Sequence, residues 1–296
     1  MRRPHRTIAI LTVFTVTACM SSTTTASSTP AGKHTMATRS PSPPPSTTKP
    51  PPPPPPPRVI MSSFRASDGT LVTLARFTGT VFFRLHAGSS DPGSAALSVV
   101  HAGPAVGPIE RHRLLAAFNG GFLLAAGAGG YEQEGHVISP LRNGLMSLVI
   151  DRSGAARIGV WRVSVPQPHE AVFSVRQNLT PLVRFGRPAP AAADWGAWGA
   201  TLGGGAYVAR SALGMTPSGQ LIFAGGMSTV PADLATALAH AGARIAMELD
   251  INPEWVQLDV ARVPGGVLRA AIPGQERPPG QYLAGWTRDF ITVLGP

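Results

Sequence analysis

A run of eight consecutive prolines at residues 50–57 divides this 296-residue chain into two parts of different character. Proline has no backbone N–H and a fixed φ, so the run cannot enter a helix or a sheet interior and favours an extended rod of roughly 25 Å. Residues 20–57 are otherwise rich in Ser, Thr and Ala and lack the apolar periodicity of a core. We therefore predict a disordered tether over residues 20–57 and a single globular domain over residues 58–296.

The positive charge of the chain is concentrated before that domain. The formal net charge is +10, but six Lys and Arg residues and no acidic residue precede Arg58, so the domain itself carries only +4. Dense positive charge on a domain is the usual mark of nucleic-acid binding. The small excess here predicts a protein without a nucleic-acid partner.

The first nineteen residues have the layout of a bacterial lipoprotein signal. Three arginines in residues 1–6 are followed by an apolar stretch, residues 7–18, that is too short to span a bilayer as a mature helix. The only cysteine, Cys19, follows the tripeptide Val-Thr-Ala, a junction that resembles the lipobox at which the thiol is lipidated. The alternative is an incidental thiol with cleavage further along the chain. We predict a lipid-anchored protein on the extracytoplasmic face of the cell membrane, with no disulfide.

The globular part alternates short apolar runs with Gly, Pro, Asn and Asp, which predicts many strands and few helices. One helix is expected over residues 231–241, with Pro231 at its first position, Ser228-Thr229 as caps and Gly242 after its end. The helix leads directly into an apolar stretch, so we predict an α+β fold with twisted, mostly antiparallel or mixed sheets. The predicted strands are residues 70–77, 80–86, 114–118, 145–151, 156–163, 206–214, 220–224, 244–249 and 290–294.

Two short segments of the domain bear on a functional site. Asn119-Gly120-Gly121 follows an apolar run, and an Asn-Gly pair is first of all the signal of a tight turn with positive φ. Arg210 lies inside an apolar strand, where a cation is costly unless it meets an anion. Its partner is either a structural carboxylate, Asp194 or Asp151, or an anionic ligand such as a phosphate.

Two further segments carry carboxylates. Glu248 and Asp250 alternate along the strand that follows the helix, so they share one face with their backbones about 6.6 Å apart. Carboxylates placed in this way are either functional or held by arginines, and Asp250 has the further alternative of capping the next turn. Residues 131–144 mix acidic, basic and histidine side chains in a loop that either lines a site or is solvated.

Taken in order, these segments resemble the phosphodiester glycosidase family. The resemblance rests on AAFNGGF (residues 116–122), NLTPLVRFGRP (178–188), RSALGMTPSGQLIFAGG (210–226), the predicted helix and AMELD (246–250). It covers residues 71–294, and the order and spacing of the segments make it more specific than any one of them. It implies an α+β domain that hydrolyses the bond between a sugar C1 and an oxygen of a phosphodiester.

The resemblance also assigns roles to individual residues. Asn119, Gly120 and Gly121 match the family's Asn-Gly-Gly-Phe element and Arg210 matches its strand arginine, which implies substrate binding. Asp250 matches the aspartate of the family's Asn-Leu-Asp-Gly-Gly-Gly-Ser element, which implies catalysis. Here Glu248 stands where that element has Asn, and Ile-Asn-Pro-Glu follows Asp250, so the close backbone approach that glycines allow is lost.

The residue types suit hydrolysis of a sugar-1-phosphodiester in cell-envelope glycans. A phosphate monoester leaves as an anion, so Arg210 would neutralise it while Asp250, with Glu248 beside it, stabilises the cationic sugar or activates water. Mutual repulsion of the two carboxylates would raise one pKa toward neutrality. The alternatives are a non-catalytic envelope protein that binds anionic glycans and a hydrolase of ordinary glycosidic bonds in polysaccharides. The clustered acids leave a divalent cation as an alternative, but no ligand spacing specifies one, and no cofactor is predicted.

Overall fold

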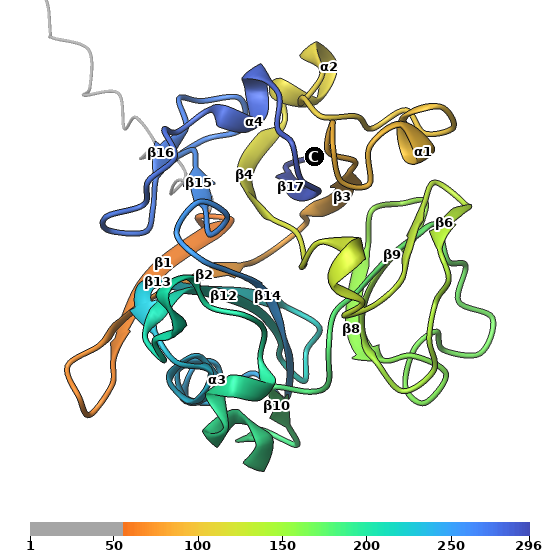
Figure 1. Ribbon diagram of the computed structural model, residues 1–296. Helices are drawn as coiled ribbons and strands as arrows, with labels where there is room; N and C mark the ends of the chain where they lie inside the picture. Colours follow the sequence, from red (N-terminus) through yellow and green to blue (C-terminus); the bar gives the residue numbers. More distant parts are fainter. Residues whose placement is uncertain (1–55) are drawn as a thin grey trace, which may run out of the picture. The chain divides into compact units, whose positions relative to one another are not determined.

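Three antiparallel sheets supply most of the regular structure in residues 56–296, the part of the chain that the computed structural model describes (Figure 1). The seven-stranded sheet consists, in spatial order, of β1 (Val59–Arg65), β2 (Leu71–Phe77), β13 (Leu221–Thr229), β12 (Val208–Met215), β14 (Ile245–Ile251), β10 (Val183–Arg184) and β11 (Arg187–Pro188). The second sheet consists of β16 (Arg269–Ala270), β15 (Leu258–Val260), β4 (Leu114–Asn119), β17 (Phe290–Leu294) and β3 (Phe82–His86). The third consists of β6 (His136–Ser139), β5 (Tyr131–Gln133), β9 (Ser174–Gln177), β7 (Met146–Ile150) and β8 (Ala156–Val160).

The helices of the described residues are short, apart from α3 (Pro231–His240). The Asp233 carboxylate accepts a hydrogen bond from the Val230 N–H at 3.4 Å, so this contact caps α3 in place of the predicted Ser228-Thr229. The other helices are α1 (Ser94–Leu97), α2 (Pro108–Arg111) and α4 (Gln281–Ala284), with 3-10 turns η1 (Leu124–Ala126), η2 (Pro190–Ala193), η3 (Trp195–Ala197) and η4 (Leu202–Gly204). None of these helices has the length and apolar character of a membrane span.

β14 is buried on both faces, which explains why its residues are apolar apart from Glu248 and Asp250. Met247 and Leu249 point into the largest core cluster, whereas Ala246 packs in the cluster that Leu234 and Leu238 of α3 complete. Full burial of an aliphatic side chain contributes about 1.5–3 kcal/mol, so this strand is held firmly between two apolar layers. Any charged side chain on it is therefore buried as well.

The structure confirms the predicted α+β fold, and each predicted strand overlaps an observed one. The prediction missed strands that are short, polar or at an edge. β9 reads Ser-Val-Arg-Gln although all four residues are buried, and β1 is an edge strand with mostly exposed residues. The predicted signal, Cys19 and residues 20–55 of the predicted tether lie outside the described residues.

Strand ends from all three sheets meet at one place. Asn119 ends β4 and pairs with Phe290, the first residue of β17, so the two residues before β17 lie beside it. The end of β14 pairs with β12, where Ile251 is opposite Arg210. β9 supplies Arg176, whose side chain reaches Asp289. This meeting point contains most of the polar residues that the sequence singled out.

Candidate active site

Three buried ion pairs lie where these strand ends meet. In each pair a guanidinium nitrogen lies 2.8 Å from a carboxylate oxygen, and no side chain is more than 6% exposed. The pairs are Arg176 with Asp289, Arg210 with Glu248, and Arg288 with Asp250. Moving two charges out of water costs several kcal/mol per ion, so the fold retains them here at a cost in stability.

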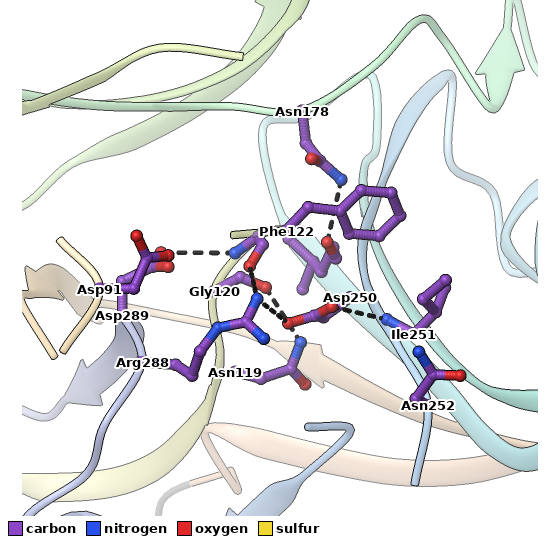
Figure 2. A network of polar contacts seen from close by, with 12 residues as sticks. Asp91, Asn119, Gly120, Phe122, Asn178, Asp250, Ile251, Asn252, Arg288 and Asp289 are labelled. Carbon is purple, nitrogen blue, oxygen red and sulfur yellow. Dashed lines mark hydrogen bonds and ion pairs between the residues drawn. The ribbon is translucent and has the colours of Figure 1, made fainter. Parts of the chain in front are cut away.

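Asp250 accepts a hydrogen bond on each carboxylate oxygen. The Ile251 N–H donates to Oδ1 at 2.8 Å, and Arg288 donates to Oδ2 at 2.8 Å (Figure 2). Burial raises the pKa of Asp250 to about 7, against the opposing effect of Arg288. Of the alternatives left open by the sequence, the carboxylate is therefore held by an arginine, and its other bond is to the adjacent N–H at the end of β14.

Asp250 and Arg288 line a pocket of about 450 Å³, here called the Asp250 pocket. Its other walls are mainly apolar and come from the segment after β4, the loop before β12 and the turn after β14. They are Phe122, Leu123, Ala126, Gly127, Ala128, Leu179, Gly199, Ala200, Ile251, Asn252 and Trp255. Within this lining Asp250 is the one carboxylate and Arg288 the one cation. The Arg288 guanidinium lies 4.6 Å from the centroid of the Trp255 ring, a cation–π contact that helps to fix its position.

The turn after Asp250 keeps a glycine-like conformation without a glycine. Asn252 has a φ of 76°, in the left-handed region that favours Gly and tolerates Asn. Its side chain accepts a hydrogen bond from the Leu202 N–H at 2.8 Å and donates to the Ala200 carbonyl at 3.3 Å. The residue therefore fastens the Gly-rich loop before β12 to the rim of the Asp250 pocket.

Glu248 and Arg210 pair with each other inside the protein and do not line the Asp250 pocket. Both side chains are fully buried, and Arg210 also donates to the Trp198 carbonyl at 2.9 Å. The structural partner of Arg210 is thus Glu248, not Asp194 or Asp151. Burial raises the pKa of Glu248 to about 8, although Arg210 opposes the shift. Of the two predicted catalytic carboxylates, the pocket is lined by Asp250 alone.

The predicted positive-φ turn at Asn119-Gly120-Gly121 is wrong, because neither glycine lies in the left-handed region. These glycines instead allow close approach of charged side chains. A Cβ at Gly120 would lie 1.9 Å from Oδ2 of Asp289, and one at Gly121 would lie 2.8 Å from Cζ of Arg176. The segment therefore forms the wall against which the buried ion pairs pack.

Asn119 is buried and its amide bonds to other protein groups. It donates to the Ser211 hydroxyl at 2.8 Å and accepts from the Gln257 N–H at 3.2 Å. Gly121 contributes its carbonyl, which accepts from Arg288 at 3.1 Å. In the structure the segment 119–121 therefore helps to orient Arg288 through the Gly121 carbonyl. Its predicted role in substrate binding stays a prediction.

Sequence reasoning missed four residues of the site, namely Arg176, Asn178, Arg288 and Asp289. Asn178 donates to the carbonyls of Glu248 and Leu249, each at 2.9 Å, and so fixes the end of β14. Arg288 and Asp289 directly precede the apolar run of β17. Their position next to a predicted strand was the one feature of the sequence that could have marked them as site residues. The polar segment 131–144 forms the β5–β6 hairpin and does not line the Asp250 pocket.

This arrangement suits charge stabilisation and proton transfer. A carboxylate whose pKa is near 7 can accept or donate a proton at neutral pH, and a fixed guanidinium can hold an anionic oxygen. Within the described residues no cluster of three or more His, Cys, Asp or Glu side chains is arranged to hold a metal ion.

No family model matches the sequence, and no curated protein matches it. Solved structures that are similar to this chain include the following three. The catalytic domain of zebrafish N-acetylglucosamine-1-phosphodiester alpha-N-acetylglucosaminidase, auto-inhibited by its pro-peptide, is 14% identical, with a TM-score of 0.49 over 80% of this chain and 82% of that one. A hypothetical protein from Synechocystis is 14% identical, with a TM-score of 0.47 over 82% and 64% of the two chains. A putative exported protein from Burkholderia pseudomallei K96243 is 13% identical, with a TM-score of 0.40 over 76% and 74%. These values do not establish a family, and membership of the phosphodiester glycosidases stays a prediction.

Proposed function

We propose that the protein hydrolyses sugar-1-phosphodiester bonds in cell-envelope glycans, and that the reaction takes place in the Asp250 pocket. The observation that carries the proposal is the composition of that pocket. One carboxylate and one guanidinium, 2.8 Å apart, are set among mainly apolar walls. An anionic leaving group needs a cation, and an oxocarbenium-like sugar needs a carboxylate, so the pair supplies both requirements.

The presence of a single pocket carboxylate favours a phosphate leaving group over an alcohol. Glycosidases that expel an alcohol use two carboxyl groups, one of them as an acid. Glu248, the other predicted catalytic residue, is paired with Arg210 outside the pocket lining. A phosphate monoester leaves as an anion without protonation, so Asp250 suffices as the base. In this reaction a water oxygen bonds to C1, its proton passes to Asp250, and the C1–O bond breaks.

Arg288 replaces Arg210 in this proposal as the cation that contacts the phosphate. Arg210 is fully buried and donates to Glu248, whereas Arg288 lines the pocket. Arg288 uses one nitrogen, Nη2, for both Asp250 and Gly121, and within the described residues its Nη1 makes no hydrogen bond and is not among the buried unpaired atoms. Donors therefore remain for a phosphate oxygen, in contacts that are about twice as strong as neutral hydrogen bonds.

The test is to incubate the full-length protein with a chromogenic sugar phosphodiester and measure release of reducing sugar. We expect turnover by the native protein and a loss of at least about 100-fold in the Asp250→Asn variant. The Arg288→Gln variant should lose its preference for the phosphodiester over a neutral glycoside. The matched Arg210→Gln variant should keep that preference even where it is less stable. Turnover that survives Asp250→Asn would refute the proposal.

Non-catalytic binding of an anionic glycan is the second candidate. It is favoured by the hydrogen bonds from Ile251 and Arg288 that already occupy both oxygens of Asp250. In that case the native protein would bind the sugar phosphodiester without releasing sugar, and Asp250→Asn would change affinity little.

We further propose that the protein is exported and held at the membrane by a lipid on Cys19. The proposal rests on the signal-like residues 1–18 and the lipobox-like junction before Cys19. Replacing Cys19 by Ala should release the protein from the membrane fraction. Unchanged membrane association of a cleaved Cys19→Ala protein would contradict it.

A further inference from the structure

A second pocket, of about 320 Å³, shares no lining residue with the Asp250 pocket. It is bordered by β8 and the loop that follows, the β10–β11 hairpin, the end of β12 and the start of β14. We call it the Phe185 pocket. It is lined by Arg157, Ile158, Val160, Val163, Ser164, Val165, Gln167, Pro181, Arg184, Phe185, Met215, Thr216, Pro217, Arg244 and Ile245. Its volume is at the lower end of the range for small-molecule sites, about 300–1,000 Å³.

The lining of the Phe185 pocket combines apolar walls with positive charge. Aliphatic and proline side chains form most of it, and its charged members are Arg157, Arg184 and Arg244, with no acidic residue. Arg157 has a carboxylate partner, Glu170, at 3.6 Å. Within residues 56–296 the side chains of Arg184 and Arg244 make no ion pair. Two guanidinium groups beside an apolar pocket without a counter-ion are complementary to an anion with an apolar body.

The conformation of Phe185 is the second observation. It occupies the two-residue turn of the β10–β11 hairpin, because Arg184 pairs with Arg187. Phe185 and Gly186 have φ values of 53° and 77°, the positive values of a type I′ turn. Such a turn favours Asn, Asp or Gly at its first position, and an aromatic side chain there is strained. Turn formation therefore does not explain Phe185.

The Phe185 side chain is also not explained by core packing. It is 67% exposed, and its ring centroid lies 5.1 Å from the Arg184 guanidinium and 5.8 Å from that of Arg244. Cation–π contacts at exposed sites are worth about 0.5–1 kcal/mol, too little to account for a large exposed apolar group. The ring instead lies beside both arginines and lines the same pocket as they do.

We propose that the Phe185 pocket binds a single-chain anionic amphiphile, with one alkyl chain and one phosphate or carboxylate head group. The chain lies against the aliphatic walls, and the head group is bound by Arg184 and Arg244 beside the Phe185 ring. The small volume restricts the ligand to one chain. This binding is independent of the hydrolysis proposed for the Asp250 pocket.

The test measures binding to the full-length protein by calorimetry with three probes: dodecyl phosphate below its micellar concentration, dodecanol and inorganic phosphate. We expect dodecyl phosphate to bind at least tenfold more tightly than either of the others, because it alone has both parts. If inorganic phosphate binds as tightly as dodecyl phosphate, the site recognises only the anion. If dodecanol binds as tightly as dodecyl phosphate, the site recognises only the alkyl chain. Either result overturns the proposal.

Variants separate a binding role from a structural one. The Arg184→Gln/Arg244→Gln double variant should bind dodecyl phosphate at least tenfold more weakly, since charge-assisted contacts are lost. Arg269→Gln, which removes an exposed arginine of β16 outside the pocket, should leave the affinity unchanged. Phe185→Asn installs a residue that the turn prefers, so it should maintain or raise the melting temperature while weakening binding at least threefold. Unchanged affinity in both pocket variants would refute the proposal.

Discussion

The Asp250→Asn variant, expected to stop turnover, also tests how the fold tolerates a buried charge. Two effects oppose each other. Asn removes a carboxylate that burial disfavours, as shown by the rise of the Asp250 pKa from 3.8 to about 7. Asn also places an amide NH₂ where an oxygen now accepts from either Ile251 or Arg288, both of which are donors.

The size of each effect follows from the structure. A shift of about three pKa units corresponds to about 4 kcal/mol, the cost of keeping Asp250 ionised in the fold at pH 8. The donor that loses its acceptor costs about 1–3 kcal/mol at any pH. At pH 5 the unfolded chain is already ionised at this position, so burial has cost the native protein about 1.6 kcal/mol and the two proteins should be about equally stable. At pH 8 we expect Asp250→Asn to be at least as stable as the native protein.

The sign of the pH dependence makes this change in relative stability measurable. Between about pH 4 and pH 7 the folded protein holds a proton on Asp250 that the unfolded chain has released. The contribution of this group to stability is therefore complete below pH 4 and is lost as the pH rises through 7, with a slope of up to about 1.4 kcal/mol per pH unit. Glu248 adds the same trend up to about pH 8 in both proteins.

Urea unfolding of both proteins at pH 5, 6, 7 and 8 is the assay. The difference in the free energy of unfolding between them should change by several kcal/mol across the series. A variant that is about 3–5 kcal/mol less stable than the native protein at pH 8 would refute the reasoning. It would show that the ion pair with Arg288, rather than the burial of Asp250, dominates the energy.

Three further predictions follow from the same contacts. Gly120→Ala should destabilise the fold by more than about 3 kcal/mol in urea unfolding because its Cβ would overlap Asp289, whereas Gly205→Ala, with no atom within 4 Å of the new Cβ, should stay within about 1 kcal/mol. Arg210→Met should cost about 3 kcal/mol or more by leaving Glu248 without a counter-ion, and adding Glu248→Leu should recover most of the loss, as measured by melting temperature. If Asp250 acts as a base and no acid is needed, kcat/KM should rise through about pH 7 and form a plateau, and a bell-shaped profile would contradict that assignment.

The local sequence predicted those features that depend on neighbouring residues. Apolar runs between turn residues located the main strands, and Pro231, the apolar face of α3 and Gly242 located the helix. Alternation also predicted Glu248 and Asp250 on one face of a strand, and the structure adds that this strand is buried on both faces. β9 escaped prediction because Arg176 and Gln177 are polar and become buried only through partners far along the chain.

Only the tertiary structure decided which charges meet. Arg210 and Glu248 are 38 residues apart, as are Asp250 and Arg288. The residues around each charged side chain do not indicate which distant residue it pairs with. The same holds for Gly120, which is required because Asp289, the residue before β17, lies where a Cβ at position 120 would be. Secondary structure follows from interactions over a few residues, whereas an ion pair depends on the positions to which the whole fold brings two distant side chains.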